Sequence, residues 1–466
     1  DWVGPDSSAR GVFDAVDGTQ IGVAGSLGFD RAAMVEYAKS VGGPALRAMT
    51  FHERAKMLKA LALSLSEQKD ALYEASYATG ATLKDHMIDV DGGIGTMLVI
   101  ASKGRREMPN AHVYVDGQVE QLSRSGQFVG QHICTPKLGV AVHINAFNFP
   151  VWGMLEKMAP ALLAGMPVIV KPATATCQVT ELAFQMIIAS GLLPAGTAQL
   201  ITGDLGNLLD HLGGQDVVSF TGSEATGRHL RTHPALIQNA VHFMAEQDSL
   251  NASVLGADVA VGSAEFDLFV KEVHREITVK AGQKCTAVRR VMVPDYLLDP
   301  VQAALIERLA NTPIGNPRHP DTRMGALVSL SQRRDVLEKA AQIGTEVECV
   351  FGAGDLPVLI DANAEKGAFV APRLFRCDSP DQAQAVHDIE AFGPVSTLMG
   401  YRDAGHASQL LNRGQGSLVA SVFTADAGFA RDMVLGSAAY HGRLYFNNAT
   451  SAKESTGHGS PMPHLV

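Results

Sequence analysis

The sequence predicts an α/β protein with a doubly wound parallel sheet and a second α/β unit. Three observations lead to this fold class. The chain has 466 residues, of which 46% are hydrophobic and 18% are charged, so two or three compact domains are expected. Between Gly139 and Phe220, short apolar runs alternate with segments of helical periodicity, and the alternation returns after Asn251. Such alternation favours a parallel sheet, whose ligands bind at the carboxyl ends of the strands.

Two local patterns precede this sheet. Thr50-Phe51-His52-Glu53 is a capping box followed by apolar residues at helical spacing, so a helix is expected to begin near Thr50. Residues 112–134 alternate between polar and apolar side chains around Gly117 and Gly126, which is typical of a β-hairpin.

The sheet itself is expected to use strands at 140–144, 168–170, 199–202 and 217–220, with helices at 152–163 and 180–190. Gly191 ends the second of these helices. Residues 203–206 have glycines at the wrong spacing for a Gly-x-Gly-x-x-Gly loop, so a standard Rossmann pyrophosphate site is not expected. The second unit, 251–424, is expected to hold helices at 266–280, 300–310 and 332–343 and a strand at 417–423.

Composition excludes several classes of protein. The net charge of −10 argues against nucleic acid or an anionic membrane as the main partner. The most apolar run, 158–170, is too short for a bilayer and reads as buried core. The first residues lack the basic and apolar regions of a signal peptide, and the five cysteines are widely spaced, so a cytoplasmic protein with reduced thiols is expected. The histidines show no ligand spacing, and no metal is assigned.

Three side chains carry candidate chemistry: the thiol of Cys285, the carboxylate of Glu246 and the amide of Asn148. Together they supply what is needed to attack an aldehyde, stabilise its oxyanion and hydrolyse a thioester. Each alone has an ordinary interpretation. Cys285 could be a small buried hydrophobe, Glu246 and Asp248 a solvated turn, and Asn148 a turn residue before Pro150, which suits a first helical turn.

With their flanks, in particular Gly-Gln-Lys-Cys285-Thr-Ala and Asn148-Phe-Pro, these residues resemble the aldehyde dehydrogenase family. The resemblance extends from about Thr50 to the C-terminus. It implies that Cys285 is the nucleophile, Asn148 the oxyanion donor and Glu246 the base, with Asp248 as the competing base. The other four cysteines are then structural. It also implies a variant sheet that binds the dinucleotide without the usual glycine fingerprint.

The resemblance further implies which residues bind NADP, with NAD tolerated. Lys171 would meet the adenosine ribose or its phosphate, and the Phe-Thr-Gly222-Ser223 loop would take the pyrophosphate at a helix N-terminus. Glu390 would bind the nicotinamide ribose and Phe392 its ring. The preference for NADP rests on Thr174, which stands where many NAD-selective relatives carry a glutamate.

Two segments resemble a smaller branch of the family: Glu246-Gln-Asp-Ser-Leu-Asn and 451–461. The first is similar to members from both phenylacetate and aerobic benzoate degradation, and the second resembles the phenylacetate ring-opening branch. The branch implies non-acylating oxidation of a CoA-linked aldehyde, 3-oxo-5,6-dehydrosuberyl-CoA semialdehyde, to its acid. Two alternatives stay open: 3,4-dehydroadipyl-CoA semialdehyde of the benzoyl-CoA pathway, and a non-catalytic binding protein on this fold. An acylating enzyme is disfavoured because a positioned base at Glu246 favours water.

The resemblance also implies a domain plan. A dinucleotide-binding domain is expected at 1–111 and 139–250, an α/β catalytic domain at 251–430, and an oligomerisation arm at 112–138 and 431–466. The arm implies a homodimer or larger homo-oligomer. Relatives of the branch continue beyond the position of Val466, so a fused or associated hot-dog hydratase domain is a further partner that the resemblance admits.

Overall fold

The computed structural model describes residues 4, 9–26, 28–354 and 356–460 and divides into two compact units. Unit 1 comprises Asp1–Phe13, Gln20–Ser76 and His86–Gln247; unit 2 comprises Asp14–Thr19, Tyr77–Asp85 and Asp248–Val466. The predictions on the first residues and on the end of the 451–461 segment lie wholly or partly outside the described residues.

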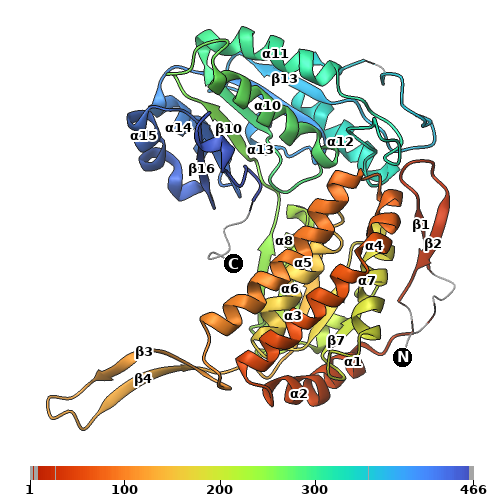
Figure 1. Ribbon diagram of the computed structural model, residues 1–466, viewed down its shortest axis with the longest axis vertical. Coiled ribbons are helices and arrows are strands. Elements are labelled where there is room, and N and C mark those ends of the chain that lie inside the picture. The colour runs from red at the N-terminus through yellow and green to blue at the C-terminus, as the bar shows by residue number, and fades with distance from the viewer. Residues whose placement is uncertain (1–3, 5–8, 27, 355, 461–466) are drawn as a thin grey trace. The chain divides into compact units, whose positions relative to one another are not determined.

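Unit 1 contains the predicted doubly wound sheet, and all five of its strands are parallel. In Figure 1 this sheet lies behind helices of the same unit. In spatial order the strands are β7 (Ala198–Leu200), β6 (Val168–Lys171), β5 (Ala141–Ile144), β8 (Val217–Thr221) and β9 (His242–Glu246). The first strand of this sheet along the sequence is the central β5. The next two, β6 and β7, lie on one side of it, and the last two, β8 and β9, lie on the other. The order therefore reverses between β5 and β8, which is where ligands bind in open α/β sheets.

Helices cover both faces of this sheet because alternate strand residues point to opposite sides. Val168 and Val170 of β6 pack on one face and Ile169 on the other. The first face carries α3 (Phe51–Glu67), α5 (Leu83–Arg106), α6 (Trp152–Leu163) and α7 (Cys177–Ala189), with α2 (Gly43–Arg47) and α4 (Lys69–Ser76) in the same core. The second carries α1 (Arg31–Tyr37), α8 (Glu224–Arg231) and α9 (Pro234–Gln238).

The ends of two helices show different solutions to the same need for hydrogen-bond acceptors. The predicted capping box at Thr50 is confirmed, with both reciprocal bonds between Thr50 and Glu53 present. Helix α6 begins at Trp152, the first residue of the predicted range 152–163, so Pro150 precedes the helix and does not lie in its first turn. Its first amides, from Val151 and Trp152, donate to the buried carboxylate of Asp89 at 3.2 and 2.8 Å. The cap thus comes from α5, more than 60 residues away in sequence.

Two antiparallel hairpins also belong to unit 1. The predicted one is confirmed as β3 (Tyr114–Gln121) paired with β4 (Val129–Cys134). The other, β1 (Arg10–Phe13) with β2 (Gln20–Ala24), was not predicted. The β3–β4 hairpin carries exposed apolar side chains: Val115, Val119, Leu122, Phe128, Val129 and Ile133.

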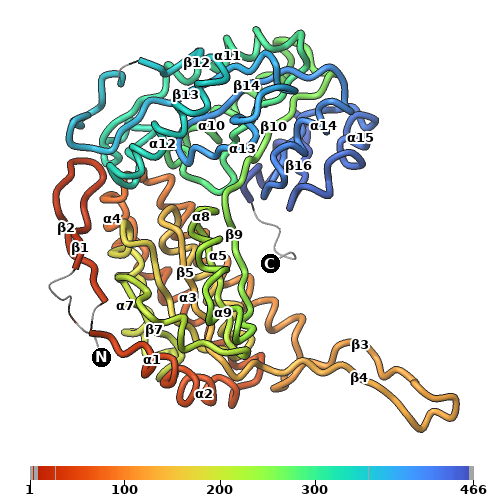
Figure 2. The backbone as a smooth tube through the Cα atoms, turned by 180° about the vertical axis from the view of Figure 1, so that it is seen from behind, coloured from red at the N-terminus to blue at the C-terminus, as the bar shows by residue number. Residues whose placement is uncertain are grey.

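Unit 2 is built on a seven-stranded sheet that is parallel except at one edge (Figure 2). In spatial order its strands are β12 (Glu348–Phe351), β13 (Arg373–Cys377), β14 (Val395–Tyr401), β11 (Arg290–Pro294), β10 (Ala252–Leu255), β15 (Ala420–Phe423) and β16 (Leu444–Asn447). Only β12, at the edge, runs antiparallel to its neighbour. The segment 431–466, predicted as part of an arm, thus includes a strand of this sheet; the assignment of that segment to an arm stays a prediction.

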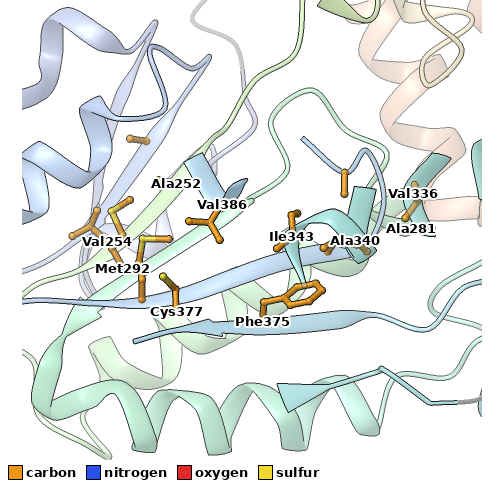
Figure 3. Packing of buried hydrophobic residues seen from close by; sticks show 14 of the residues in the cluster. Ala252, Val254, Ala281, Met292, Val336, Ala340, Ile343, Phe375, Cys377 and Val386 are labelled. Carbon is orange, nitrogen blue, oxygen red and sulfur yellow. The ribbon is translucent and has the colours of Figure 1, made fainter. Parts of the chain in front are cut away.

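Two hydrophobic cores cover the faces of this second sheet. One lies against α10 (Ala264–Thr278) and α11 (Leu298–Ala310). The other, part of which is seen in Figure 3, lies against α12 (Leu330–Ile343), α13 (Ala385–Asp388), α14 (Ala404–Asn412) and α15 (Ala427–Ser437). Ala281, labelled in Figure 3, belongs to this second core and stands four residues before Cys285. The catalytic candidate is therefore anchored to a packed core.

Several predicted elements differ from the observed ones in their bounds, most of them by one or two residues. Helix α7 begins at Cys177, three residues earlier than predicted, and β15 begins at Ala420, three residues later. Helix α10 ends at Thr278 and does not reach Lys280. The reason is that Lys280 and Ala281 have left-handed backbone angles, with φ of 55° and 49°, which no helical pattern can contain.

Candidate active site

The predicted residues of unit 1 lie at one edge of its sheet. Asn148 follows β5, Lys171 ends β6, Gly222 and Ser223 follow β8, and Glu246 ends β9. The strand ends are level, because Ile144 pairs in register with both Lys171 and Phe220. The parallel sheet thus brings together five of the sequence-predicted side chains or glycines at the edge where ligands bind.

The end of β6 and the segments after β6 and β8 carry four of the residues that were predicted to contact the dinucleotide: Lys171, Thr174, Gly222 and Ser223. Ser223 is the N-cap of α8, and its hydroxyl accepts from the amide of Thr226. The amide of Gly222 donates to the carbonyl of Glu246 at 3.1 Å, which ties the loop to the end of β9. Thr174 opens a short 3-10 turn after Lys171 and is half-buried. Burial lowers the pKa of Lys171, and the carboxylate of Asp204 opposes that shift.

An unusual buried amide lies at the same edge. Asn145 directly follows β5 and is 5% exposed, yet among the described residues neither of its side-chain amide atoms has a hydrogen-bond partner. Leaving a buried polar group without a partner typically costs about 1–3 kcal/mol. Polar groups of this kind fit a ligand that completes them, and the edge is the one at which a dinucleotide would bind.

Glu246 has acidic and basic neighbours on α6. Burial raises the pKa of Glu156 to about 7; Lys157 opposes the shift, and the carboxylates of Glu246 and Asp89 add to it. The ammonium of Lys157 donates to the hydroxyl of Thr221 at 2.7 Å, at the end of β8. Sequence reasoning did not single out either α6 residue, because a Glu-Lys pair on a helix usually faces solvent.

In unit 2, Cys285 occupies a tight turn after a strained segment. The amide of Ala287 donates to the carbonyl of Lys284 at 3.1 Å, so Cys285 and Thr286 are the central residues of a β-turn. The strained residues before it are Lys280 and Ala281. Such conformations persist only where the surroundings hold them.

Two buried side chains supply that support. The carboxylate of Asp85 accepts from the amide of Lys280 at 2.8 Å, and the side-chain amide of Gln283 donates to the Lys280 carbonyl at 3.1 Å while its oxygen accepts from the amide of Val328 at 3.0 Å. The turn is therefore presented by a fixed backbone.

Buried side chains also hold the carbonyl groups of the turn. Asn251 donates its amide to the carbonyls of Cys285 and Ala287, at 2.7 and 3.1 Å. Arg289 donates to the carbonyls of Gly282 and Lys284, at 2.9 and 3.3 Å. Asn251 and Arg289 are buried, and neither was given a role from the sequence, although both lie in segments that were recognised.

Residues 390–394, the Glu-x-Phe-Gly-Pro segment, contain the predicted Glu390 and Phe392, and both of these belong to the same network. The carboxylate of Glu390 contacts Arg289 at 3.2 Å through one oxygen and accepts from the amide of Ser249 at 2.9 Å through the other. The Arg289 guanidinium lies 5.4 Å from the centre of the Phe392 ring. Burial raises the pKa of Glu390, and Arg289 opposes the shift. A carboxylate retains acceptor sites beyond these two bonds, so Glu390 can still meet a ribose hydroxyl.

This combination of a doubly wound sheet and a cysteine turn can be compared with known proteins. Residues 2–459 match the model of the aldehyde dehydrogenase family. The chain belongs to this family. It is therefore an enzyme that oxidises aldehydes with a nicotinamide cofactor, and the non-catalytic alternative is set aside.

Individual relatives agree with this assignment. The 3,4-dehydroadipyl-CoA semialdehyde dehydrogenase of Aromatoleum evansii is 42% identical over 463 residues, which are 99% of this chain and 90% of that protein. Protein MaoC of Klebsiella aerogenes is 48% identical over 146 residues, 31% of this chain and 41% of that protein. Among solved structures, the betaine aldehyde dehydrogenase of Staphylococcus aureus in complex with NAD+ has a TM-score of 0.84 at 25% identity, over 96% of this chain and 85% of that one.

The aldehyde dehydrogenase fold predicted from the sequence is thus confirmed. A nicotinamide dinucleotide fits the edge of the unit 1 sheet, because that edge offers the N-terminus of α8, the cation of Lys171 and the orphaned amide of Asn145.

Lys284, which precedes Cys285, is paired with a carboxylate in this aldehyde dehydrogenase. Its ammonium lies 2.6 Å from the carboxylate of Glu276, and both side chains are buried. Burial acts to raise the pKa of Glu276, but Lys284, together with His458 and Arg275, holds that pKa below its ordinary value. The charge of Lys284 is therefore largely balanced within the pair.

The five cysteines all lie in the described part of the chain, and no disulfide joins any of them. Over the described ranges, no three His, Cys, Asp or Glu side chains are grouped so that they could hold a metal ion. Likewise, every helix within those ranges is too short or too polar to cross a membrane.

Proposed function

We propose that this aldehyde dehydrogenase oxidises a coenzyme A-linked semialdehyde from aromatic degradation to its carboxylic acid. The observation that carries the proposal is the 42% identity, over 99% of the chain, with a dehydrogenase of 3,4-dehydroadipyl-CoA semialdehyde. Two substrates follow from two observations. Residues 451–461 resemble the phenylacetate branch and favour 3-oxo-5,6-dehydrosuberyl-CoA semialdehyde, whereas the identity with the Aromatoleum enzyme favours 3,4-dehydroadipyl-CoA semialdehyde.

The proposed chemistry uses three residues in sequence. The thiolate of Cys285 attacks the aldehyde carbon, and the side-chain amide of Asn148 with the backbone N–H of Cys285 stabilises the oxyanion. Loss of hydride leaves a thioester on Cys285. Glu246 then takes a proton from water, whose oxygen forms the new bond to the acyl carbon as the carbon–sulfur bond breaks. The aldehyde is oxidised by two electrons, and one water is consumed.

The proposed cofactor is NADP, with NAD tolerated, and it supplies the acceptor for the hydride. The residues proposed to hold it are Lys171, Thr174, Gly222, Ser223, Glu390 and Phe392. Residues 1–111 and 139–250 would then form the dinucleotide-binding domain and 251–430 the catalytic domain, in a cytoplasmic enzyme. A fused or associated hydratase domain also stays a prediction.

The substrate proposal predicts a ranking of aldehydes. We expect kcat/KM for a CoA-linked semialdehyde to exceed that for a short aliphatic aldehyde by about tenfold or more, since extra contacts outside the reacting group lower the barrier. Absorbance at 340 nm, with both proposed semialdehydes and a matched aldehyde without CoA, provides the measurement. Equal values for all three would reject the CoA-linked class.

The catalytic roles predict different defects in the two half-reactions. Cys285→Ala should abolish both hydride transfer and acid release, because no covalent adduct forms. Glu246→Gln should release about one equivalent of reduced cofactor per active site and then stall at the thioester. The matched control is Asp248→Asn, which should turn over like the wild type. If Asp248→Asn stalls and Glu246→Gln does not, the base is Asp248.

Cofactor preference is predicted to depend on Thr174. A carboxylate at this position would repel the 2′-phosphate of NADP by roughly 1–4 kcal/mol at a separation of about 4 Å, and Thr174 carries no such charge. Thr174→Glu should therefore reverse the ratio of kcat/KM for NADP to kcat/KM for NAD, mainly because NADP binds more weakly. Thr174→Gln introduces a side chain of the same size as glutamate but without its charge, and it should retain the preference for NADP. A wild-type enzyme that prefers NAD by about tenfold or more would show that Thr174 does not select the cofactor.

Self-association is predicted from the β3–β4 hairpin, whose exposed apolar side chains and strand edges suit pairing with a second copy. Light scattering at micromolar concentration should give a homodimer or larger homo-oligomer. Aspartate at both Val119 and Phe128 should produce monomers, because buried charges would lie in the interface. Val358→Asp, at a residue that is 97% exposed in unit 2, is the matched control and should not alter the assembly. A monomeric wild type would contradict the prediction.

A further inference from the structure

The segment 451–460 contains a buried histidine that reaches the turn of Cys285. His458 is 3% exposed although it lies near the end of the described chain. One ring nitrogen, Nε2, lies 2.8 Å from the carbonyl oxygen of Thr286. The other, Nδ1, is hydrogen-bonded to the hydroxyl of Ser421 on β15. His458 thus connects the core sheet of unit 2 with the residue that follows the proposed nucleophile.

These partners fix the protonation of the imidazole. A carbonyl oxygen only accepts, so Nε2 carries the proton and donates it to Thr286. Nδ1 then accepts from the Ser421 hydroxyl, and the ring is neutral. Burial lowers the pKa of His458 to about 4; nearby Lys284 and Arg443 add to the shift, while Glu276 and the bond to Thr286 oppose it. The neutral tautomer is therefore the state near neutral pH.

The surroundings leave little freedom to this contact. A Cβ added at Gly459 would lie 2.8 Å from the hydroxyl oxygen of Thr286, so the segment approaches the turn closely at this glycine. Arg443 donates to the carbonyl of Gly457 at 3.2 Å, and Tyr445 contacts Ser455 through their hydroxyls. Both supporting residues come from β16 or the residue just before it. The segment is thus held by β16 and Arg443 at two residues that precede His458.

The contact completes a pattern in the turn. Its four carbonyls, from Lys284 to Ala287, each have a side-chain partner: Arg289 for the first, Asn251 for the second and fourth, and His458 for the third. Arg289 and Asn251 also belong to the network of Glu390 and Ser249. His458 is the partner that comes from the C-terminal segment.

We infer that His458 is a positioning residue, which holds the Cys285 turn in its reactive geometry through the hydrogen bond from Nε2 to the Thr286 carbonyl. The inference rests on the proposed role of Cys285 as nucleophile. His458 acts through the backbone and does not touch the reacting atoms. The 451–461 segment, which resembles one branch of the family, thus contains a residue with a structural role at the Cys285 turn. Misplacing a reacting group by about 1 Å can cost on the order of a hundredfold in rate.

Two substitutions separate the two bonds of the imidazole. In His458→Gln the amide nitrogen stands where Nε2 stood and can still donate to Thr286. In His458→Asn the shorter amide reaches Ser421 but not Thr286. Both are neutral and polar, so they form a matched pair. We expect kcat to fall about tenfold in His458→Asn with KM for the aldehyde within about threefold, and His458→Gln to recover most of the rate.

A second readout does not depend on turnover. Iodoacetamide modifies thiols, and mass spectrometry of the whole enzyme can report the ratio of modification at Cys285 to that at the exposed Cys134. Because a loosened turn exposes the half-buried Cys285, this ratio should rise about threefold or more in His458→Asn and stay near the wild-type value in His458→Gln. The midpoint of thermal unfolding, measured for the wild type and both variants, reports any general loss of stability.

Several outcomes would overturn the inference: an unchanged kcat and ratio in His458→Asn, or equal defects in both variants. Should His458→Asn fail to fold, Ser421→Ala takes its place. That change releases Nδ1, so the ring can adopt the other tautomer, whose Nε2 cannot donate to Thr286; a smaller change in the same direction is expected, and none would overturn the inference. Failure here is distinct from failure of the proposed function, in which Cys285→Ala would remain active.

Discussion

The packing of the interior of unit 2 around the Cys285 turn depends on the guanidinium of Arg289. It is buried, pairs with Glu390, and donates to carbonyls of the segments before Cys285 and after Phe392. A buried ion pair loses several kcal/mol when one partner is removed, because the other charge then lacks compensation. The same contacts therefore stabilise the fold and set the distance between the cysteine turn and the Glu-x-Phe-Gly-Pro segment. Stability and site geometry cannot be separated here.

Much of unit 1 could be predicted because its elements satisfy local rules. The helix at 152–163 was predicted at its exact bounds, and the capping box at Thr50 marked the start of α3 correctly. Helix α5 was not predicted, since Gly92, Gly93 and Gly95 interrupt its pattern. Packing explains two of these glycines. A Cβ at Gly93 would lie 2.8 Å from the Cα of Trp152, and one at Gly92 would lie 2.6 Å from its ring. Tertiary contact with α6 outweighs the poor helix propensity of glycine.

The candidate site shows a similar division. The identities of Cys285, Glu246 and Asn148 could be proposed from flanking residues, because the motifs are local. The partners that hold the turn could not: Arg289 joins Glu390 across 101 residues, and His458 joins Thr286 across 172. Nothing local to Asn251, Ser249 or Asp85 distinguishes them from ordinary polar residues. Their roles follow only from the order of strands in the seven-stranded sheet, which brings distant segments to one place.

The approach of Gly282 to Gly393 has a consequence for how this enzyme can diversify. A Cβ at Gly282 would lie 2.2 Å from the carbonyl oxygen of Gly393, so the two chains meet through bare backbone. Gly282 also has a φ of 68°, which other residues rarely adopt. No side chain can be enlarged, shortened or exchanged at this junction to alter its spacing. A change of substrate range by substitution must therefore come from segments that line the site elsewhere, because the junction itself tolerates no side chain.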